Sequence, residues 1–313
     1  MKLLVRSFLV FCVVFLFACT LSAQSHNIQT DECTSSVASS ANNDGNRHDQ
    51  KGEYQKAIDD YKNAIRAEPT CAASYINLGA TYFETERFDD SVKALFEAAK
   101  YTSSLRWVIF NNIGRAYSSL GDFKDALEAF TQAIKLQSKD PRAYSSRAKL
   151  YLALDKGDLA AADIQALLKL KGWKSPSAPD WAVIAYLGYR LQNLDTEASQ
   201  FLDDAATRIP DKTTDSTAVF RFFIKKIDAD KLLAIAKDQG DKAGVRPDKE
   251  KEDLTDAHAY IGMYLLLSGQ KKEAREQFEW VRDNGSKKPI MYQVAASELR
   301  HTQAGEASPK PPD

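Results

Sequence analysis

The feature that most constrains this chain is a spaced pattern of small and aromatic residues between Trp107 and Ala133. Apolar residues recur at helical spacing in two runs of this segment, WVIFNNIGRAYSSL and DFKDALEAFTQA. The two runs meet at Gly121. Small residues such as Gly114 lie on the apolar faces, where they let two helix backbones approach closely. One such hairpin has too little core to stand alone, so the segment predicts neighbours with the same pattern.

The pattern recurs with a period of about 34 residues. Gly114-x-x-Tyr117 follows Gly79-x-x-Tyr82 by 35 residues, and Gly45 precedes Gly79 by 34. Each of these units continues with small and aromatic residues at matching places. A helix-turn-helix of this length, with Gly-x-x-Tyr and Ala-x-x-x-Phe, resembles the tetratricopeptide repeat (TPR). The resemblance implies an all-α fold, a right-handed superhelix (α-solenoid) of about six repeats.

The phasing of the pattern divides the chain. Five TPR-like repeats are expected at residues 38–71, 72–106, 107–140, 141–174 and 179–210. They are followed by an irregular helical segment and charged loop at 211–253, a final TPR-like repeat and capping helix at 254–302, and a disordered tail at 303–313.

The part from Val219 to Arg300 is similar to exported bacterial TPR proteins of the NlpI type. Those proteins are periplasmic or lipid-anchored adaptors that hold proteases or cell-wall enzymes. The similarity contains no diagnostic site motif. It therefore implies an architecture and a compartment rather than a particular partner.

The N-terminus has the pattern of a secretory signal peptide. Lys2 and Arg6 precede an uninterrupted apolar run from Phe8 to Cys19. This run of 12 residues is too short to span a bilayer, which takes roughly 20. The pattern predicts export to the periplasm or the medium.

Two cleavage sites remain open. Cleavage after Ala23 would remove residues 1–23 and leave a polar N-terminal segment, residues 24–37. Alternatively, Leu16-Phe17-Ala18-Cys19 resembles a lipobox, in which residues 1–18 are removed and Cys19 carries a lipid that anchors the protein at the cell envelope.

Two cysteines, Cys33 and Cys71, remain in the exported chain. They stand just before the first repeat and at the start of the second, so both are expected at the same end of the stack. In an oxidising compartment a disulfide between them is expected; the alternative is a pair of unlinked thiols.

Neither composition nor motifs indicate an enzyme. The formal net charge is −1, with 42 basic and 43 acidic residues, so no global field attracts nucleic acid. None of the four histidines stands at metal-ligand spacing from another histidine or a cysteine, and His258 is expected to serve in packing. No nucleophile or phosphate-loop motif is present. The sequence therefore predicts no catalysis, no cofactor and no metal.

Function is therefore assigned to the surface. In the family, the first helices of the repeats line a concave groove that binds extended peptides or partner helices. Helical projection places ten residues toward that groove: Asn77, Phe83, Asn111, Asn112, Arg115, Ser118, Ser145, Ser146, Lys149 and Leu152. Asparagine amides both donate and accept, so they can pair with a peptide backbone of any sequence. The alternative is that these are ordinary polar residues on an exposed face.

Two functions follow as hypotheses. The first is an exported scaffold or adaptor that binds a protein or extended peptide in its concave groove, with no role in nucleic-acid binding and no membrane contact except through a lipid anchor. The alternative is a structural homo-oligomer or envelope-associated spacer that uses the apolar segment from Val219 to Ile227 as its contact surface.

Overall fold

The computed structural model describes residues 33–210, 217–240 and 248–306. The predictions for the signal peptide, for Cys19 and for the last seven residues lie outside these ranges.

Over the described ranges the chain forms 15 helices and no strand, which confirms the all-α prediction. Ten helices form five consecutive pairs: α2 (Ser36–Gln50) with α3 (Tyr54–Ala67), α4 (Ala72–Glu84) with α5 (Phe88–Tyr101), α6 (Arg106–Leu120) with α7 (Phe123–Leu136), α8 (Pro141–Ala153) with α9 (Gly157–Lys171), and α10 (Ala178–Leu191) with α11 (Asp195–Arg208). Five more follow: α12 (Ala218–Phe223), α13 (Ala229–Gly240), α14 (Lys249–Leu267), α15 (Lys271–Asn284) and α16 (Ile290–Glu306).

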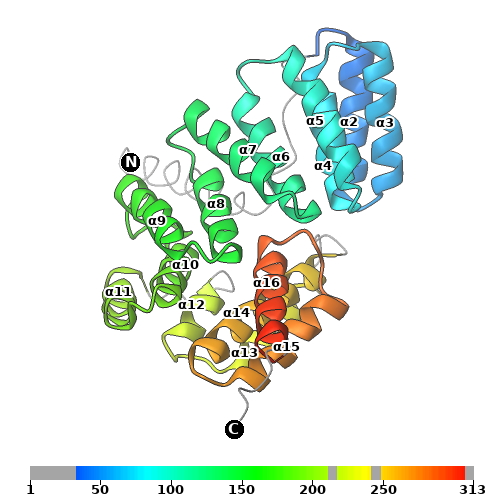
Figure 1. Cartoon of the computed structure of the whole chain (residues 1–313). Coiled ribbons are helices and arrows are strands. Elements are labelled where there is room, and N and C mark those ends of the chain that lie inside the picture. The colour runs from blue at the N-terminus through cyan, green and yellow to red at the C-terminus, as the bar shows by residue number, and fades with distance from the viewer. Residues whose placement is uncertain (1–32, 211–216, 241–247, 307–313) are drawn as a thin grey trace, which may run out of the picture.

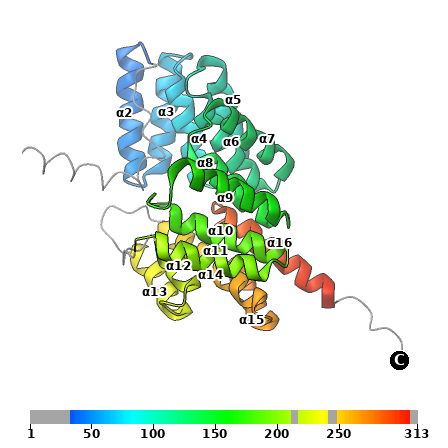
Figure 2. The same ribbon diagram turned by 90° about the vertical axis from the view of Figure 1, so that its left-hand side faces the viewer.

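The helix pairs follow a curved path, and the end of the chain returns toward its middle. In Figure 1 the pairs from α2 to α11 form an arc, α12 to α15 continue it, and α16 lies inside the arc. Figure 2, turned by 90°, shows the same sequence of layers from α2 to α15. Helix α16 packs against α8, α14 and α15 and also touches α6. The concave side of the repeats is therefore partly filled by the chain itself.

One packing contact recurs inside the hairpins. A Cβ atom placed on Gly114 would lie 2.6 Å from the ring of Phe130, and a Cβ on Gly45 would lie 2.6 Å from the ring of Tyr61. Both distances are too short for a real side chain, so only glycine lets these helices approach so closely. The role expected for Gly114 is confirmed.

The hairpin turns also repeat. The turn after α6 uses Gly121 with φ 88°, a left-handed conformation that glycine adopts at no steric cost. The equivalent turns after α4, α8 and α10 place Glu86, Asp155 and Asn193 in the same region, with φ between 54° and 57°. The fold therefore imposes this conformation even where no glycine is present, at a cost in backbone strain.

Three helices extend further than the sequence indicates. Helix α2 begins at Ser36, inside the expected polar segment, because the Ser35 hydroxyl caps it and Glu68 accepts the Ser35 backbone N–H at 2.7 Å. Helix α14 begins at Lys249, inside the expected charged loop, and α16 continues to Glu306, inside the expected tail.

The aromatic residues of the apolar segment from Val219 to Ile227 lie inside the molecule, whereas Lys225 and Lys226 are exposed. Phe220, Phe222 and Phe223 are at most 7% exposed and belong to the main hydrophobic core. Phe223 makes an edge contact with Tyr260, with ring centroids 6.2 Å apart. The phenylalanines on which the homo-oligomer hypothesis depended are therefore already used in the core, and only the end of the segment reaches the surface.

Candidate functional site

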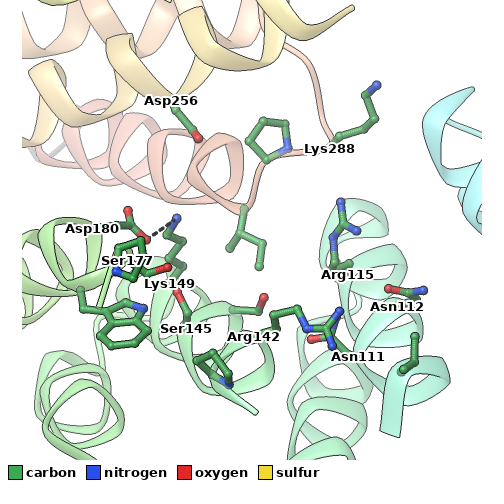
Figure 3. Close-up of a pocket in the computed structure, with 17 residues that line it drawn as sticks. Asn111, Asn112, Arg115, Arg142, Ser145, Lys149, Ser177, Asp180, Asp256 and Lys288 are labelled. Carbon is green, nitrogen blue, oxygen red and sulfur yellow. Dashed lines mark ion pairs between the residues drawn. The ribbon is translucent and has the colours of Figure 1, made fainter. Parts of the chain in front are cut away.

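The described residues border an open cavity of about 520 Å³ between the repeats and the returning C-terminal helices. Four elements contribute to its walls: α6, α8, the start of α10, and the C-terminal part comprising α14 and the loop into α16 (Figure 3). Its volume lies within the usual range for ligand pockets. The cavity is what remains of the concave groove after α16 has packed into it.

Lys149 of α8 is held by acidic residues on one side of the cavity. Its Nζ lies 3.2 Å from Oδ2 of Asp180, whose Oδ1 accepts a hydrogen bond from the Tyr260 hydroxyl at 3.1 Å. Burial alone would lower the pKa of Lys149, but Asp180 and Asp256 outweigh burial and raise it. Lys149 is therefore positively charged and paired with the carboxylates in this wall of the cavity.

The opposite part of the cavity carries two arginines. The Arg115 guanidinium lies 4.3 Å from the centre of the Phe83 ring, a cation–π arrangement. Arg142 lies 4.6 Å from the ring centre of Trp107 and also contacts its own helix cap, Asp140. These contacts fix the two side chains over aromatic rings along the rim.

Two acceptors on the cavity wall have no hydrogen-bond partner. They are Oδ1 of Asn111 and Oδ1 of Asp256. Asn111 is only 6% exposed. Burial, with the further effect of Asp180, raises the pKa of Asp256 to about 6 although Lys149 opposes it. A buried acceptor without a donor costs about 1–3 kcal/mol. The cavity therefore favours an occupant that brings N–H or O–H donors.

Six of the ten residues projected toward the groove line this cavity. They are Asn111, Asn112, Arg115, Ser145, Ser146 and Lys149. The other four, Asn77, Phe83, Ser118 and Leu152, do not line it and are all at most 4% exposed.

These four residues are packed between helices in this structure. Asn77 donates to Oδ1 of Asn42 at 3.2 Å and to Oδ1 of Asn46 at 3.0 Å, so the asparagines join the first two repeats. The Ser118 hydroxyl bonds back to the Gly114 carbonyl of its own helix at 2.7 Å. Projecting a single helix cannot reveal these contacts, because they depend on how closely the next helix approaches.

Sequence reasoning missed several residues of the cavity. Asp180 and Trp181 stand in the first helix of the fifth repeat, so extending the helical projection by one repeat would have found them. Asp256 and Lys288 come from the returning C-terminal part, and no periodicity in the sequence points to them.

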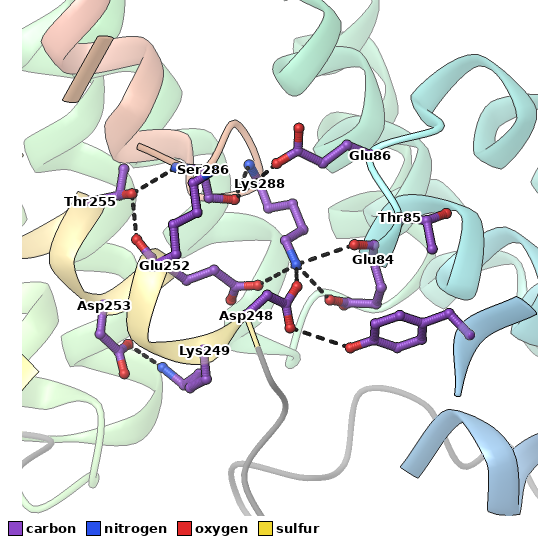
Figure 4. Close-up of polar contacts among 12 residues, drawn as sticks. Glu84, Thr85, Glu86, Asp248, Lys249, Glu252, Asp253, Thr255, Ser286 and Lys288 are labelled. Carbon is purple, nitrogen blue, oxygen red and sulfur yellow. Dashed lines mark hydrogen bonds and ion pairs between the residues drawn. The ribbon is translucent and has the colours of Figure 1, made fainter. Parts of the chain in front are cut away.

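Close to the cavity, Lys288 joins distant parts of the chain in a buried ion cluster (Figure 4). Its Nζ lies 3.1 Å from Oε2 of Glu84 and 2.6 Å from Oε1 of Glu252, and it also contacts Asp248. The Lys288 side chain is 3% exposed and that of Glu84 is 2% exposed. We call these four residues the closing cluster, because they tie the end of α4 to the start of α14 and the loop before α16.

The remaining predicted residues lie away from the cavity. Cys33 and Cys71 are joined in a disulfide with their Cα atoms 4.8 Å apart, beside the first repeat. His258 stacks on Trp280, with ring centroids 3.8 Å apart, and bonds to Gln277 at 2.7 Å, as expected for a packing residue. None of the helices in the described ranges combines the length and hydrophobicity that a membrane crossing requires.

Comparison with known proteins identifies the repeats. The family model described as TPR repeat matches residues 45–86 and 114–155. Anaphase-promoting complex subunit 3 of Schizosaccharomyces pombe is 28% identical over 143 residues, which cover 46% of this chain and 20% of that protein. The small glutamine-rich tetratricopeptide repeat-containing protein of Dictyostelium discoideum is 32% identical over 108 residues, which cover 32% of this chain and 30% of that protein. The chain thus spans no more than a third of either relative.

A solved structure extends the comparison to most of the fold. A tetratricopeptide repeat protein from Parabacteroides merdae superimposes with a TM-score of 0.53 at 17% identity, covering 85% of this chain and all of that chain. At this identity the likeness shows the fold alone. Together with the matched repeats, it establishes that the chain contains TPR repeats in a helical solenoid.

Proposed function

From the TPR repeats in this chain, we propose that it is an exported, non-catalytic scaffold that holds an extended segment of another protein in the cavity between α6, α8 and α16. Repeats of this kind present concave surfaces that bind protein partners. The single observation that carries the proposal is the unpartnered Oδ1 of Asn111, which is buried at the wall of the cavity.

The chemistry of the cavity defines the segment that would fit. Its unpartnered groups, Asn111 and Asp256, are both acceptors, whereas a peptide in extended conformation offers backbone N–H donors at regular intervals. Lys149 already faces Asp180 and Asp256, and Arg115 and Arg142 stand elsewhere along the wall, so the cavity does not call for a charged side chain of the partner. The proposed occupant is therefore a short extended segment that uses its backbone N–H groups.

The N-terminal sequence and the cysteines support export. The apolar run from Phe8 to Cys19 has the length of a signal-peptide core, and the Cys33–Cys71 pair suits an oxidising compartment. Mass spectrometry of the mature protein tests this part. A chain starting at Gln24 supports soluble export, a lipid-modified Cys19 supports the envelope-anchored form, and an uncleaved Met1 contradicts both.

A peptide-library selection tests the binding site. Peptides selected on the wild-type chain should bind Asn111→Ala at least tenfold more weakly, because one buried hydrogen bond is lost. Asn63→Ala is the matched control, since Asn63 is exposed on α3 and is not among the residues that line the cavity. Selected peptides that bind Asn111→Ala and wild type equally well would place the binding surface elsewhere and refute the proposed site.

A further inference from the structure

A second group of polar side chains lies where α16 meets the turn between α8 and α9. Asp155 stands in that turn, and Glu298 and His301 stand three residues apart on one face of α16. Nδ1 of His301 lies 3.5 Å from Oδ2 of Asp155 and 3.9 Å from Oε2 of Glu298. One ligand atom from each residue lies within 4.8 Å of the other two. The three side chains thus converge on one point from two separate elements.

Glu298 distinguishes this group from an ordinary cluster of surface charges, because it is buried and one of its oxygens has no partner. The residue is 5% exposed, and its Oε1 has no hydrogen-bond partner. A carboxylate oxygen of Glu298 also lies within 4.8 Å of one from Asp155. A buried carboxylate that faces a second carboxylate and lacks a donor requires a cation to be stable in its charged form.

We propose that Asp155, Glu298 and His301 bind a divalent transition-metal ion, for which zinc is the best match. An imidazole nitrogen with two carboxylate oxygens suits zinc rather than calcium or magnesium, which prefer oxygen ligands alone. Two ligands of a tetrahedral ion at about 2.1 Å lie about 3.4 Å apart. The observed separations therefore need only small side-chain movements, and water would complete the coordination.

The other acidic groups of the described residues do not fit an ion in the same way. Glu84, Asp248 and Glu252 also converge, but the Lys288 ammonium already lies among them. His48 contacts Asp60 through Nδ1 at 2.6 Å and Glu53 through Nε2 at 3.6 Å. Because these nitrogens lie on opposite sides of the ring, the two carboxylates cannot share one ion with it.

The position of the site gives the metal a structural role. The side chains of Asp155 and His301 are 50% and 53% exposed, so an ion can enter from solvent. Once bound, it would link α16 to the turn after α8. Ile290, at the start of the same helix, lines the cavity, so the ion would fix the far end of the helix that closes the cavity. The site is independent of the proposed peptide binding and is tested without a partner.

Calorimetric titration of the metal-depleted full chain with zinc chloride tests the proposal. The wild type should bind one equivalent of zinc, and Glu298→Gln and His301→Ala should each reduce the affinity at least tenfold. His48→Ala is the matched control, because it removes a histidine that also contacts two carboxylates, and it should bind as the wild type does. Circular dichroism of each variant establishes that it is folded.

A second measurement tests the link between the two elements. Zinc should raise the thermal midpoint of the wild type and of His48→Ala, and Asp155→Asn should abolish this rise, because Asp155 lies on the other side of the contact. Asparagine tolerates the left-handed conformation of position 155, so the variant keeps its turn. Absence of a zinc-binding event in the wild type, or binding that all three ligand variants retain, would overturn the proposal.

Discussion

Two lysines, Lys288 and Lys149, connect the repeats with the returning C-terminal helices. They differ in how deeply they are buried and in whether a cavity lies beside them. Lys288 lies among three carboxylates, and its side chain is 3% exposed. Lys149 faces two carboxylates in the wall of the cavity, and its side chain is 20% exposed. In the first cluster the ammonium group is already paired with all three carboxylates. The second lies beside a cavity of about 520 Å³ and includes an acceptor of Asp256 without a partner.

The difference indicates what each cluster can do. A buried ion pair that is fully enclosed can fix how two parts of a chain meet, but it has no spare group for a ligand. A partly exposed cluster with an unpartnered acceptor is less stabilising and can exchange partners. We therefore expect substitutions at Lys288 to affect folding and substitutions around Lys149 to affect folding only modestly.

The largest effect is expected for Lys288→Ala. Removing the ammonium leaves Glu84, Asp248 and Glu252 facing one another in a buried place, which should reduce the free energy of unfolding by about 3–5 kcal/mol. Urea denaturation followed by circular dichroism measures it. The neighbouring Lys287 is exposed, so Lys287→Ala should change stability by less than about 0.5 kcal/mol. Equal losses in the two variants would contradict the structural role of the closing cluster.

A smaller loss, about 1–2 kcal/mol, is expected for Lys149→Ala in the same assay. Without Lys149 the two carboxylates repel each other, but Asp256 already has a raised pKa and can take up a proton to relieve the repulsion. The comparison would fail if Lys149→Ala destabilised the protein as much as Lys288→Ala does.

The smallest change in the free energy of unfolding, and the only increase, is expected for Asp256→Asn. In the folded protein the pKa of the Asp256 carboxyl is raised to about 6, from an ordinary value of 3.8. The unfolded chain therefore loses this proton first, and wild-type stability falls as the pH rises from about 4 to above 6. Asparagine does not titrate, so the variant should exceed the wild type by about 1 kcal/mol at pH 7.5.

Urea denaturation at several pH values measures the Asp256→Asn effect. The advantage of the variant should shrink as the pH approaches 4, where Asp256 is protonated in the folded wild type. An advantage that is the same at pH 4.5 and pH 7.5 would show that ionisation of Asp256 is not its cause.

Sequence reasoning succeeded where the fold is periodic. The close approach of a glycine to an aromatic ring, as between Gly114 and Phe130, repeats in other hairpins, and the spacing of small residues was enough to predict that Gly114 allows such an approach. The same logic placed Asn111, Arg115 and Lys149 toward the concave side. It does not reveal the bonds of Asn77 to the first repeat, because an asparagine that faces solvent and one that bonds to a neighbouring repeat occupy the same helical position.

The sequence could not reveal the contacts that form when the C-terminal helices pack back against the repeats. Glu84 and Lys288 are 204 residues apart, and Asp155 and His301 come from elements with no shared motif. Contacts of this kind follow from the curvature that many small interhelical angles accumulate. No single stretch of sequence encodes that sum.

The contact between α16 and the earlier repeats also alters how the array should come apart. An open repeat array is one-dimensional: each unit touches only its neighbours, so unfolding can begin at either terminus and spread. Here the first repeat is cross-linked by Cys33–Cys71, and the last helices hold Glu84 of the second repeat and the turn at Asp155. From the second repeat to α16 such a chain has the connectivity of a ring, so the last helices cannot fray independently of the repeats. Hydrogen exchange should therefore show similar protection in the last helices and in the central ones, in contrast to the graded protection of an open array.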